Sequence, residues 1–167
     1  YAPLCLIKWR LYEFNVIRAL SNEENGLFNL KHKIERKESN IENFMLNNRI
    51  RLIHGDIRNF KRCIEVSKNI DIVIHAAAMK HVPICEYNPE ETIITNVGGT
   101  RNLVKASIKN NIKKFVFIST DKAANPQTVM GTTKYKAEKI VIKANKNSKK
   151  KKNIFYGMRF GNSIGSS

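Results

Sequence analysis

The sequence has few cysteines, few acidic residues and no long hydrophobic run. Its three cysteines, among 167 residues, are too few and too irregularly spaced for a disulfide framework or a zinc site. No apolar run approaches the ~20 residues that cross a bilayer, and the start lacks the basic region and apolar core of a signal peptide. We therefore expect no metal site, no membrane segment within these residues, and a cytoplasmic location.

The shortage of acidic residues leaves a strongly basic chain. There are 30 lysines and arginines against 14 aspartates and glutamates, which gives a net charge of +16. Such a balance suits nucleic acid or phosphorylated ligands. The excess is mostly lysine spread along the chain, and its densest run, residues 149–152, is typical of a solvated loop. The sequence shows no platform of aromatic residues interleaved with basic ones, so we expect no nucleic-acid partner.

Short apolar runs alternate with segments of helical spacing. The pattern predicts strands over residues 4–9, 49–54, 71–75, 113–119 and 153–159, and helices over residues 11–20, 92–110 and 129–144, with a further helix ending near residue 66. Strands that alternate with helices indicate a parallel sheet of βαβ units. The predicted fold is a Rossmann-like, doubly wound α/β sheet. No glycine-rich turn precedes residue 4, so the first strand and the phosphate-binding loop of such a fold are missing.

Reactive side chains follow the most prominent predicted strand. Residues 115–119 read as a buried strand, and Thr120, Asp121 and Lys122 come where it ends. Met130 and Lys134 lie four residues apart on the following helix, so they share one helix face that can point back at the strand end. Ligands of open α/β sheets bind just outside the carboxyl ends of the strands. The sequence therefore predicts that the catalytic site lies at the end of this strand.

Several longer motifs, collinear along the chain, carry a resemblance to a known family. They are His54-Gly55-Asp56-Ile57-Arg58, His75-Ala-Ala-Ala-Met-Lys80-His81-Val-Pro83, Glu86-Tyr-Asn-Pro89, Thr95-Asn96-Val-Gly-Gly-Thr100, Ser119-Thr120-Asp121-Lys122-Ala-Ala-Asn125-Pro126, Val129-Met130-Gly131-Thr-Thr-Lys134 and Arg159-Phe-Gly-Asn162-Ser-Ile-Gly165-Ser. From about residue 4 to its end, the chain resembles the nucleotide-sugar 4,6-dehydratases of polysaccharide biosynthesis, in the extended short-chain dehydrogenase/reductase superfamily. Met130 stands where that superfamily usually has Tyr, which is similar to the large membrane-anchored branch that acts on UDP-N-acetylglucosamine.

The resemblance implies that residues 1–167 are a partial catalytic domain. The glycine-rich start and the C-terminal part that closes over the sugar nucleotide are missing, and the sequence starts at Tyr1 instead of Met, so we expect a longer protein. The relatives imply a UDP-sugar substrate, a homo-oligomer when full length, and NAD. Lys8, Trp9 and Arg10 follow the first predicted strand, where an acidic residue would favour NAD, so NADP stays an alternative.

The family reaction removes water and leaves a 4-keto-6-deoxy sugar, while a nicotinamide takes hydride from C4 and returns it to C6. The resemblance makes Asp121 the acid that protonates the departing C6 hydroxyl, which needs a raised pKa. It makes Lys122 the base that takes the C5 proton, which needs a lowered pKa. Thr120 would hydrogen-bond the sugar near its C4 hydroxyl, and Lys134 would bind the nicotinamide ribose. Since Met130 cannot exchange a proton, the C4 proton must leave through Thr120 and Asp121 or through water.

Other motif positions match the binding residues of the family. The cofactor-binding positions are Asp56, Ile57, Ala76, Ala77, Ala78, Asn96 and Lys134, and the substrate-binding positions are Lys80, His81 and Asn162. Several have a purely structural alternative: Asp56 can cap the next helix, Asp121 can cap a turn, and Met130 can fill a core.

Two other functions compete with dehydration. A 4-epimerase shares the fold and the cofactor, but it needs no acid–base pair for the loss of water, so Asp121 and Lys122 favour the dehydratase. A basic remnant that binds nucleic acid or a partner without catalysis fits the charge of +16.

Overall fold

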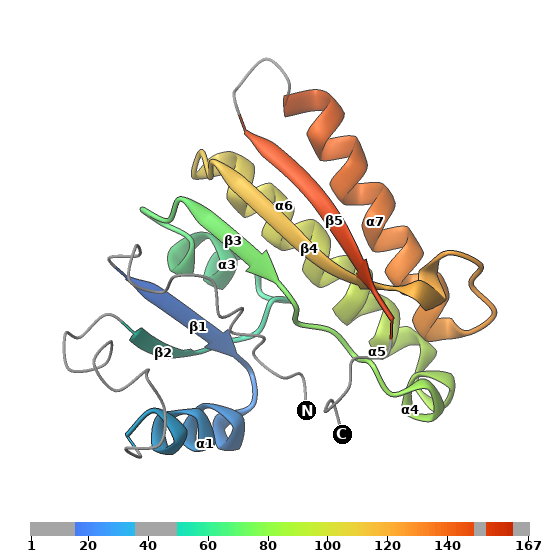
Figure 1. Cartoon of the computed structure of the whole chain (residues 1–167), viewed down its shortest axis with the longest axis horizontal. Helices are drawn as coiled ribbons and strands as arrows, with labels where there is room; N and C mark the ends of the chain where they lie inside the picture. Colours follow the sequence, from blue (N-terminus) through green and yellow to red (C-terminus); the bar gives the residue numbers. More distant parts are fainter. Residues whose placement is uncertain (1–15, 36–49, 149–152, 162–167) are drawn as a thin grey trace. The chain divides into compact units, whose positions relative to one another are not determined.

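The computed structural model describes residues 16–35, 50–148 and 153–161 (Figure 1). The chain divides into two compact units, and the boundary between them falls between Asp56 and Ile57. The predicted strand over residues 4–9, together with Lys8, Trp9, Arg10, Asn162 and the lysine run at 149–152, lies outside the described residues.

The first unit contains two parallel strands and a helix. Strand β1 (Ile17–Ser21) leads into helix α1 (Glu24–Glu35), and strand β2 (Ile50–His54) pairs with β1 from Ile17 opposite Ile50 to Ser21 opposite His54. The predicted strand at 49–54 is confirmed. The predicted helix at 11–20 is wrong over residues 17–20, because those residues pair with β2 instead. The spacing of apolar residues in so short a segment fits both a helix and a strand. Pairing with β2 therefore decides which of the two forms.

The second unit is built on a three-stranded parallel sheet in the order β3-β4-β5. Its strands are β3 (Ile72–His75), β4 (Lys114–Thr120) and β5 (Ile154–Phe160). All three predicted strands of this unit are confirmed to within one residue at each end. Central strand β4 buries Phe115, Val116 and Phe117, because both of its edges are paired and helices cover one face.

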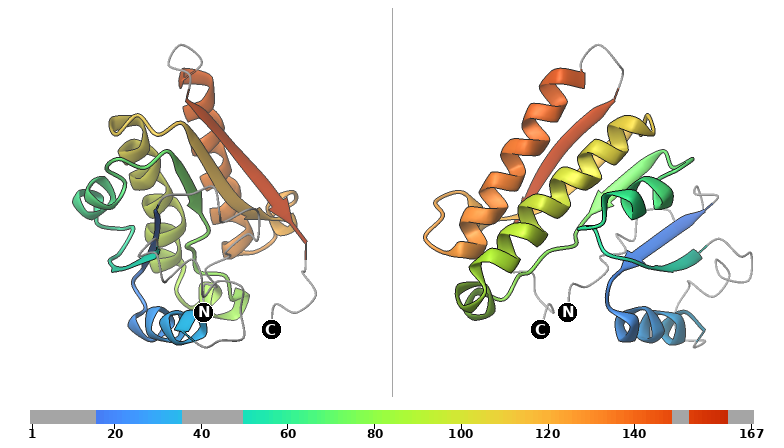
Figure 2. Two further views of the ribbon diagram at one scale, coloured as in Figure 1. Left: turned by 60° about the vertical axis from the view of Figure 1, so that its left-hand side comes forward. Right: turned by 180° about the vertical axis from the view of Figure 1, so that it is seen from behind.

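Short helices and two long ones precede or follow the strands of this unit. They are α3 (Phe60–Val66), α4 (Val82–Tyr87), α5 (Pro89–Ile93), the π-helical turn η2 (Ile94–Gly99), α6 (Thr100–Lys109), the 3-10 turn η3 (Asp121–Ala123) and α7 (Val129–Ser148). The predicted helix at 92–110 is confirmed as helical throughout, with η2 inserted between α5 and α6. The predicted helix at 129–144 is also confirmed. Figure 2 shows α6 and α7 side by side on one face of the sheet.

Aromatic rings fill the space between the sheet and these two helices. Phe115 stacks on Phe155 with 5.4 Å between ring centroids, and the imidazole of His75 lies 5.3 Å from the ring of Phe117. From the helices, Val104 and Val141 join this core. The packing fixes the carboxyl end of β4 against the start of α7.

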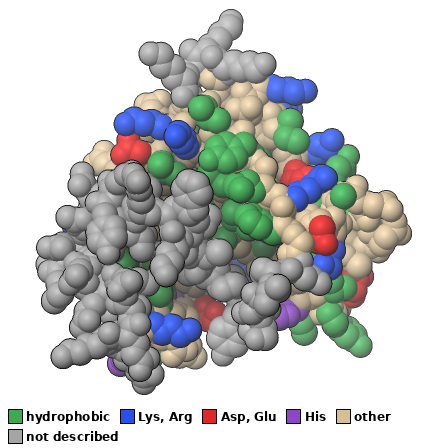
Figure 3. Space-filling model, in the orientation of Figure 1, with side chains coloured by type: hydrophobic (Ala, Val, Ile, Leu, Met, Phe, Trp, Pro, Cys, Tyr) green, Lys and Arg blue, Asp and Glu red, His purple; other side chains and the backbone are tan. Residues whose placement is uncertain are grey.

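The opposite face of the sheet is apolar. Ile74 of β3 and Tyr156 of β5 flank Val116 in register, and the two flanking side chains are 47% and 41% exposed. Figure 3 shows apolar side chains gathered over the strands on this face.

Candidate active site at the end of β4

Thr120, Asp121 and Lys122 form a hydrogen-bonded cluster where β4 ends. The hydroxyl of Thr120 donates to Oδ1 of Asp121 over 2.8 Å, and the backbone N–H of Lys122 donates to the same oxygen over 2.8 Å. Nζ of Lys122 lies 3.4 Å from that oxygen as well. The cluster exists because β4 ends in an extended residue, Thr120, and the chain then turns through η3. A hydroxyl, a carboxylate and an amine thus converge at the strand end.

The pKa of Asp121 is lowered, which is opposite to the direction expected for a resting acid. The hydrogen bond from Thr120 is the largest cause, and the backbone and ammonium of Lys122 add to it. The carboxyl group is exposed, so burial does too little to reverse this. Asp121 is therefore held as a carboxylate that can accept a proton.

Helix α7 approaches this cluster at unusually close range. A Cβ built at Gly131 would lie 2.7 Å from the backbone oxygen of Lys122, so only glycine allows the contact. Its neighbour Met130 is buried, and only 5% of it is exposed. Met130 therefore packs in the core beneath the cluster and supplies no group that titrates.

The start of α7 is capped from two sides. Oε1 of Glu86 in α4 accepts from the backbone N–H of Val129 over 2.8 Å, and the hydroxyl of Thr128 accepts from the N–H of Gly131 over 3.1 Å. Such caps satisfy N–H groups that have no partner inside the helix. Helix α4 and the cap by Glu86 were not expected from the sequence, because Glu86 lies 43 residues before its partner.

Lys134, one helical turn after Met130, is buried beneath the sheet. Its ammonium donates to the carbonyl of Ile118 over 3.0 Å and lies 4.9 Å from the centroid of the Phe117 ring. Burial lowers the pKa of Lys134 to about 8, and the carboxylate of Glu138 opposes part of this effect. An ammonium has three N–H donors, and one carbonyl engages one of them. Among the described residues only this carbonyl accepts a hydrogen bond from Lys134, so the remaining donors can bind a polar ligand.

Asn96 lies in the π-helical turn η2, and its side-chain amide forms three hydrogen bonds. Its Oδ1 accepts from the N–H of Met79 over 2.8 Å, and its Nδ2 donates to the carbonyl of Met79 over 3.1 Å and to the hydroxyl of Thr133 over 3.0 Å. The side chain is 1% exposed. Asn96 therefore holds the segment after β3 against α7, and these bonds use its amide group.

A second buried group, His75, joins this network and was not expected from the sequence. The hydroxyl of Thr100 donates to the carbonyl of Asn96 over 2.6 Å, so it accepts the N–H at Nε2 of His75, 2.8 Å away. Nδ1 of the same ring is then an unprotonated nitrogen with no partner among the described residues. Burial, with the charge of Lys134 as a smaller cause, lowers the pKa of His75 to about 3.

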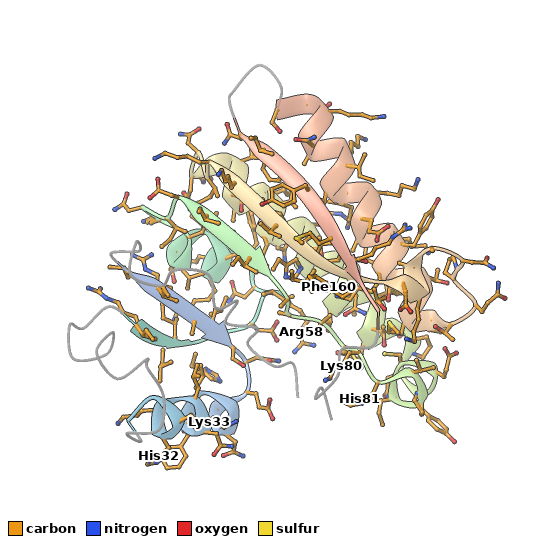
Figure 4. The ribbon with its side chains drawn as sticks, viewed as in Figure 1. His32, Lys33, Arg58, Lys80, His81 and Phe160 are labelled. Carbon is orange, nitrogen blue, oxygen red and sulfur yellow. The ribbon has the colours of Figure 1, made fainter. Side chains whose placement is uncertain are left out.

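The remaining predicted positions differ in how accessible they are. Ile57 is buried, and its Cδ1 fills the space that a Cβ at Gly99 would take, so it packs on the helices of its own unit. Ala76, Ala77 and Ala78 are half-buried just after β3. Figure 4 shows Lys80 and His81 on the exposed segment that leads from β3 into α4.

Asp56 is half-buried where β2 has ended. It does not cap α3, because Oδ1 of Asn59 accepts from the N–H of Arg62 over 3.0 Å at that helix start. The alternative of a helix cap at Asp56 is therefore wrong.

Neither a metal cluster nor a membrane span is found in the described part of the chain. No group of three or more His, Cys, Asp and Glu side chains there could hold a metal ion. No helix there is long and apolar enough to cross a membrane.

Comparison with known proteins finds relatives that are named for two different activities. A UDP-N-acetylglucosamine 4,6-dehydratase (inverting) of Campylobacter jejuni is 41% identical over 79% of this chain and 40% of its own length. A UDP-glucose 4-epimerase of Rickettsia canadensis is 39% identical over 79% of this chain and 39% of its own length. A protein of Methanocaldococcus jannaschii, named an uncharacterized membrane protein, is 43% identical over 93% of this chain and 44% of its length. The chain thus spans less than half the length of these relatives.

Solved structures show the same fold. The X-ray structure of Pen from Bacillus thuringiensis matches 90% of this chain and 44% of that one, with a TM-score of 0.81 and 40% identity. A dTDP-glucose 4,6-dehydratase from Streptomyces venezuelae, solved with NAD bound, matches 79% of this chain and 42% of that one, with a TM-score of 0.65 and 18% identity. The Rossmann-like α/β fold expected from the sequence is confirmed.

A family model described as polysaccharide biosynthesis protein matches residues 6–167, the same stretch that carries the strand-end cluster and the motifs around it. The resemblance drawn from those motifs is confirmed by this match and by the named relatives. The chain belongs to the polysaccharide biosynthesis protein family.

Proposed function

We propose that this chain carries the catalytic centre of an NAD-dependent 4,6-dehydratase that acts on UDP-N-acetylglucosamine. The observation that carries the proposal is the cluster of Thr120, Asp121 and Lys122, which places a proton acceptor and an amine side by side. The Campylobacter jejuni relative of that name supports the substrate. The activity belongs to the full-length protein, since the chain spans 40% of that relative.

The lowered pKa of Asp121 suggests how one carboxylate serves both proton steps. With Met130 unable to titrate, the C4 hydroxyl of the sugar donates to Thr120, and Thr120 passes its own proton to the carboxylate of Asp121. Asp121 is then a carboxylic acid, and it gives that proton to the departing C6 hydroxyl, which leaves as water. Lys122 is the base that takes the C5 proton. The acid of the elimination is thus generated by the preceding step, with no need for a raised resting pKa.

Several residues fit a nicotinamide cofactor. When bound, it would accept the hydride from C4 and return it to C6. Lys134 offers free N–H donors for a ribose hydroxyl, and the small side chains of Ala76, Ala77 and Ala78 let a ligand approach the backbone after β3. Asn96 is better described as a positioning residue, and Ile57 has little surface left for an adenine ring.

Strand β1 supports NAD over NADP. The first described strand ends at Ser21 and is followed by Glu23 and Glu24. A carboxylate after a strand in this position accepts from the ribose hydroxyls of NAD and repels a 2′-phosphate. Structural relatives solved with NAD agree with this choice.

The test is to incubate the full-length protein with UDP-N-acetylglucosamine and to weigh the product. A dehydratase yields a product lighter by one water molecule, and Asp121→Asn should lower its rate by a factor of about 10² to 10⁴. Lys139→Gln, far from the cluster on the exposed side of α7, serves as the control and should keep the wild-type rate.

A 4-epimerase is the second candidate, and the relative from Rickettsia canadensis favours it. Its product has the mass of the substrate and differs only at C4. Recovery of that epimer alone, with no loss of water, would replace the dehydratase proposal.

Assembly and location complete the proposal. We expect the full-length protein to form a homo-oligomer and to act on the cytoplasmic side of the membrane, and a relative named as a membrane protein supports a membrane association.

A further inference from the structure

Glu86 joins two segments of the second unit that are far apart in the sequence. It lies on α4, and Oε1 of its carboxylate accepts from the backbone N–H of Val129 over 2.8 Å. Val129 is the first residue of α7, and the two residues are 43 positions apart. The bond is therefore a tertiary contact, because another element supplies the acceptor for the helix start.

A contact of this kind fixes where a helix begins. The first four N–H groups of a helix have no acceptor inside it, so the N–H of Val129 needs a partner from outside α7. A carboxylate in that place accepts a charge-assisted hydrogen bond and also faces the positive end of the helix dipole. The hydroxyl of Thr128 caps Gly131 from the segment just before α7. Glu86 thus supplies the cap that ties this helix start to α4.

The position of the first turn of α7 decides how the proposed catalytic groups lie. Gly131, two residues after Val129, packs so closely on η3 that a Cβ would lie 2.7 Å from the backbone oxygen of Lys122. Lys134 follows on the same helix and donates to the carbonyl of Ile118 over 3.0 Å. Because these contacts are close, a small displacement of the first turn changes where Lys122 and Lys134 point.

At its other end, α4 continues into the segment that carries two predicted substrate positions. His81 is the N-cap of α4 and Lys80 precedes it, and both side chains are exposed. Cys85, next to Glu86, is fully buried, so α4 is anchored within the unit. Since α4 is one short helix, a ligand that orders Lys80 and His81 also orders Glu86.

We propose that Glu86 is a positioning residue that couples binding of the sugar nucleotide at Lys80 and His81 to the placement of α7. The inference rests on the proposed function, because it takes those two residues as substrate contacts. Glu86 acts through the backbone of Val129 and not on the substrate. The role therefore requires an acceptor oxygen at this position, and it does not require the negative charge.

Steady-state kinetics of the full-length protein with UDP-N-acetylglucosamine test this role. Glu86→Ala removes the acceptor, and we expect kcat to fall about tenfold while KM stays within about twofold of the wild-type value. Glu86→Gln keeps an oxygen that accepts from the N–H of Val129, just as amide caps serve helices as well as carboxylate caps do. This conservative variant should keep at least about a third of the wild-type kcat.

Asn153→Ala is the matched control. It also removes one side-chain hydrogen bond, the 2.7 Å bond from Nδ2 of Asn153 to the carbonyl of Ile112, but at the amino end of β5. That end of the sheet lies opposite η3, so the control should keep the wild-type kcat. Equal losses of kcat in Glu86→Ala and Asn153→Ala would overturn the proposal. A wild-type kcat in Glu86→Ala would do the same, as would a Glu86→Gln protein as slow as Glu86→Ala.

Hydrogen exchange followed by mass spectrometry separates this inference from the proposed activity. The full-length protein carries Asp121→Asn here, so that turnover does not consume the ligand. UDP-N-acetylglucosamine should slow exchange over residues 80–87 with and without Glu86→Ala, but over residues 129–134 only when Glu86 is present. Equal slowing over residues 129–134 in both proteins would contradict the coupling, as would no slowing in either. Coupled slowing in a protein that forms no dehydrated product would refute the proposed function and leave the coupling intact.

Discussion

At the scale of single residues, the burial of the Lys134 ammonium lowers the stability of the folded protein. Burial lowers the pKa of Lys134 from 10.5 to about 8, so the folded state holds this proton less tightly than the unfolded state does. At neutral pH the difference corresponds to about 3 kcal/mol of destabilisation. Lys134→Met removes that cost and also the hydrogen bond to Ile118, worth about 1 kcal/mol. We expect the variant to be about 2 kcal/mol more stable at pH 7 in urea unfolding.

The pH dependence of this gain has a definite sign. The unfolded chain binds the extra proton between pH 8 and pH 10.5, so the wild type gains stability as the pH rises through that window. The advantage of Lys134→Met is therefore complete below pH 8 and shrinks above it. The control Lys136→Met, on the exposed side of the same helix, should change stability by less than about 0.5 kcal/mol. A less stable Lys134→Met protein at pH 7 would contradict the burial cost.

The buried imidazole of His75 predicts a loss of stability in mild acid. Its pKa of about 3 in the fold lies below the ordinary 6.5, so stability is complete above pH 6.5 and falls as the pH drops from there toward 3. Between pH 7 and pH 5 this one group should cost about 2 kcal/mol. His75→Asn removes the titrating ring, so its unfolding free energy should fall less steeply over the same interval. Parallel slopes for the two proteins would show that His75 does not carry the effect.

Local spacing explains which site residues the sequence could predict. The position of Thr120, Asp121 and Lys122 at the end of β4 is predictable because an apolar strand runs directly up to them, and the shared helix face of Met130 and Lys134 is predictable from their spacing of four residues; their roles stay a prediction. The bonds from Asn96 to Met79 and Thr133 join residues 17 and 37 positions apart, which no periodicity encodes. The direction of the Asp121 pKa was also missed, since it depends on where the Thr120 hydroxyl points.

At the scale of secondary-structure elements, the close approach of α7 to η3 depends on Gly131. A Cβ there would lie 2.7 Å from the carbonyl oxygen of Lys122, and backbone cannot yield as a flexible side chain can. Gly131→Ala should therefore destabilise the protein by about 1 to 3 kcal/mol and separate the cluster from the helix. Urea unfolding measures the first effect, and the dehydration rate of the full-length protein measures the second.

Gly98 provides the matched control for this substitution. A Cβ at Gly98 meets nothing within 4 Å, and the residue lies in the helical turn η2. Gly98→Ala should thus be neutral or stabilise the protein by up to about 1 kcal/mol. Equal stability and equal activity of the two alanine variants would contradict the prediction that the close contact at Gly131 requires glycine.

The secondary-structure predictions were wrong or incomplete where local sequence alone does not determine the structure. Residues 17–21 form β1 because β2 pairs with them, although their apolar spacing also suits a helix. Helix α4 escaped prediction because Pro83 sits close to Pro89 and both usually mark breaks. In the structure each proline occupies the first turn of its own helix, where it has no N–H to lose. Strand β4 was predictable because a continuous apolar run marks a strand buried in a parallel sheet.

At the scale of the whole molecule, the fold class and the family followed from the sequence. Alternating strands and helices gave the Rossmann-like class, and the collinear motifs gave the family that the match over residues 6–167 confirms. The net charge of +16 predicted no partner by itself.

The most direct test of the central claim is to run the reaction of the full-length protein with UDP-N-acetylglucosamine in heavy water. Removal of the C5 proton by Lys122 and its return from solvent predict a 4-keto-6-deoxy product that has lost one water and carries deuterium at C5. Lys122→Met should abolish this product, whereas Lys136→Met on the far side of α7 should leave it unchanged. A product of unchanged sugar mass, epimerised at C4 and free of deuterium at C5, would contradict the account.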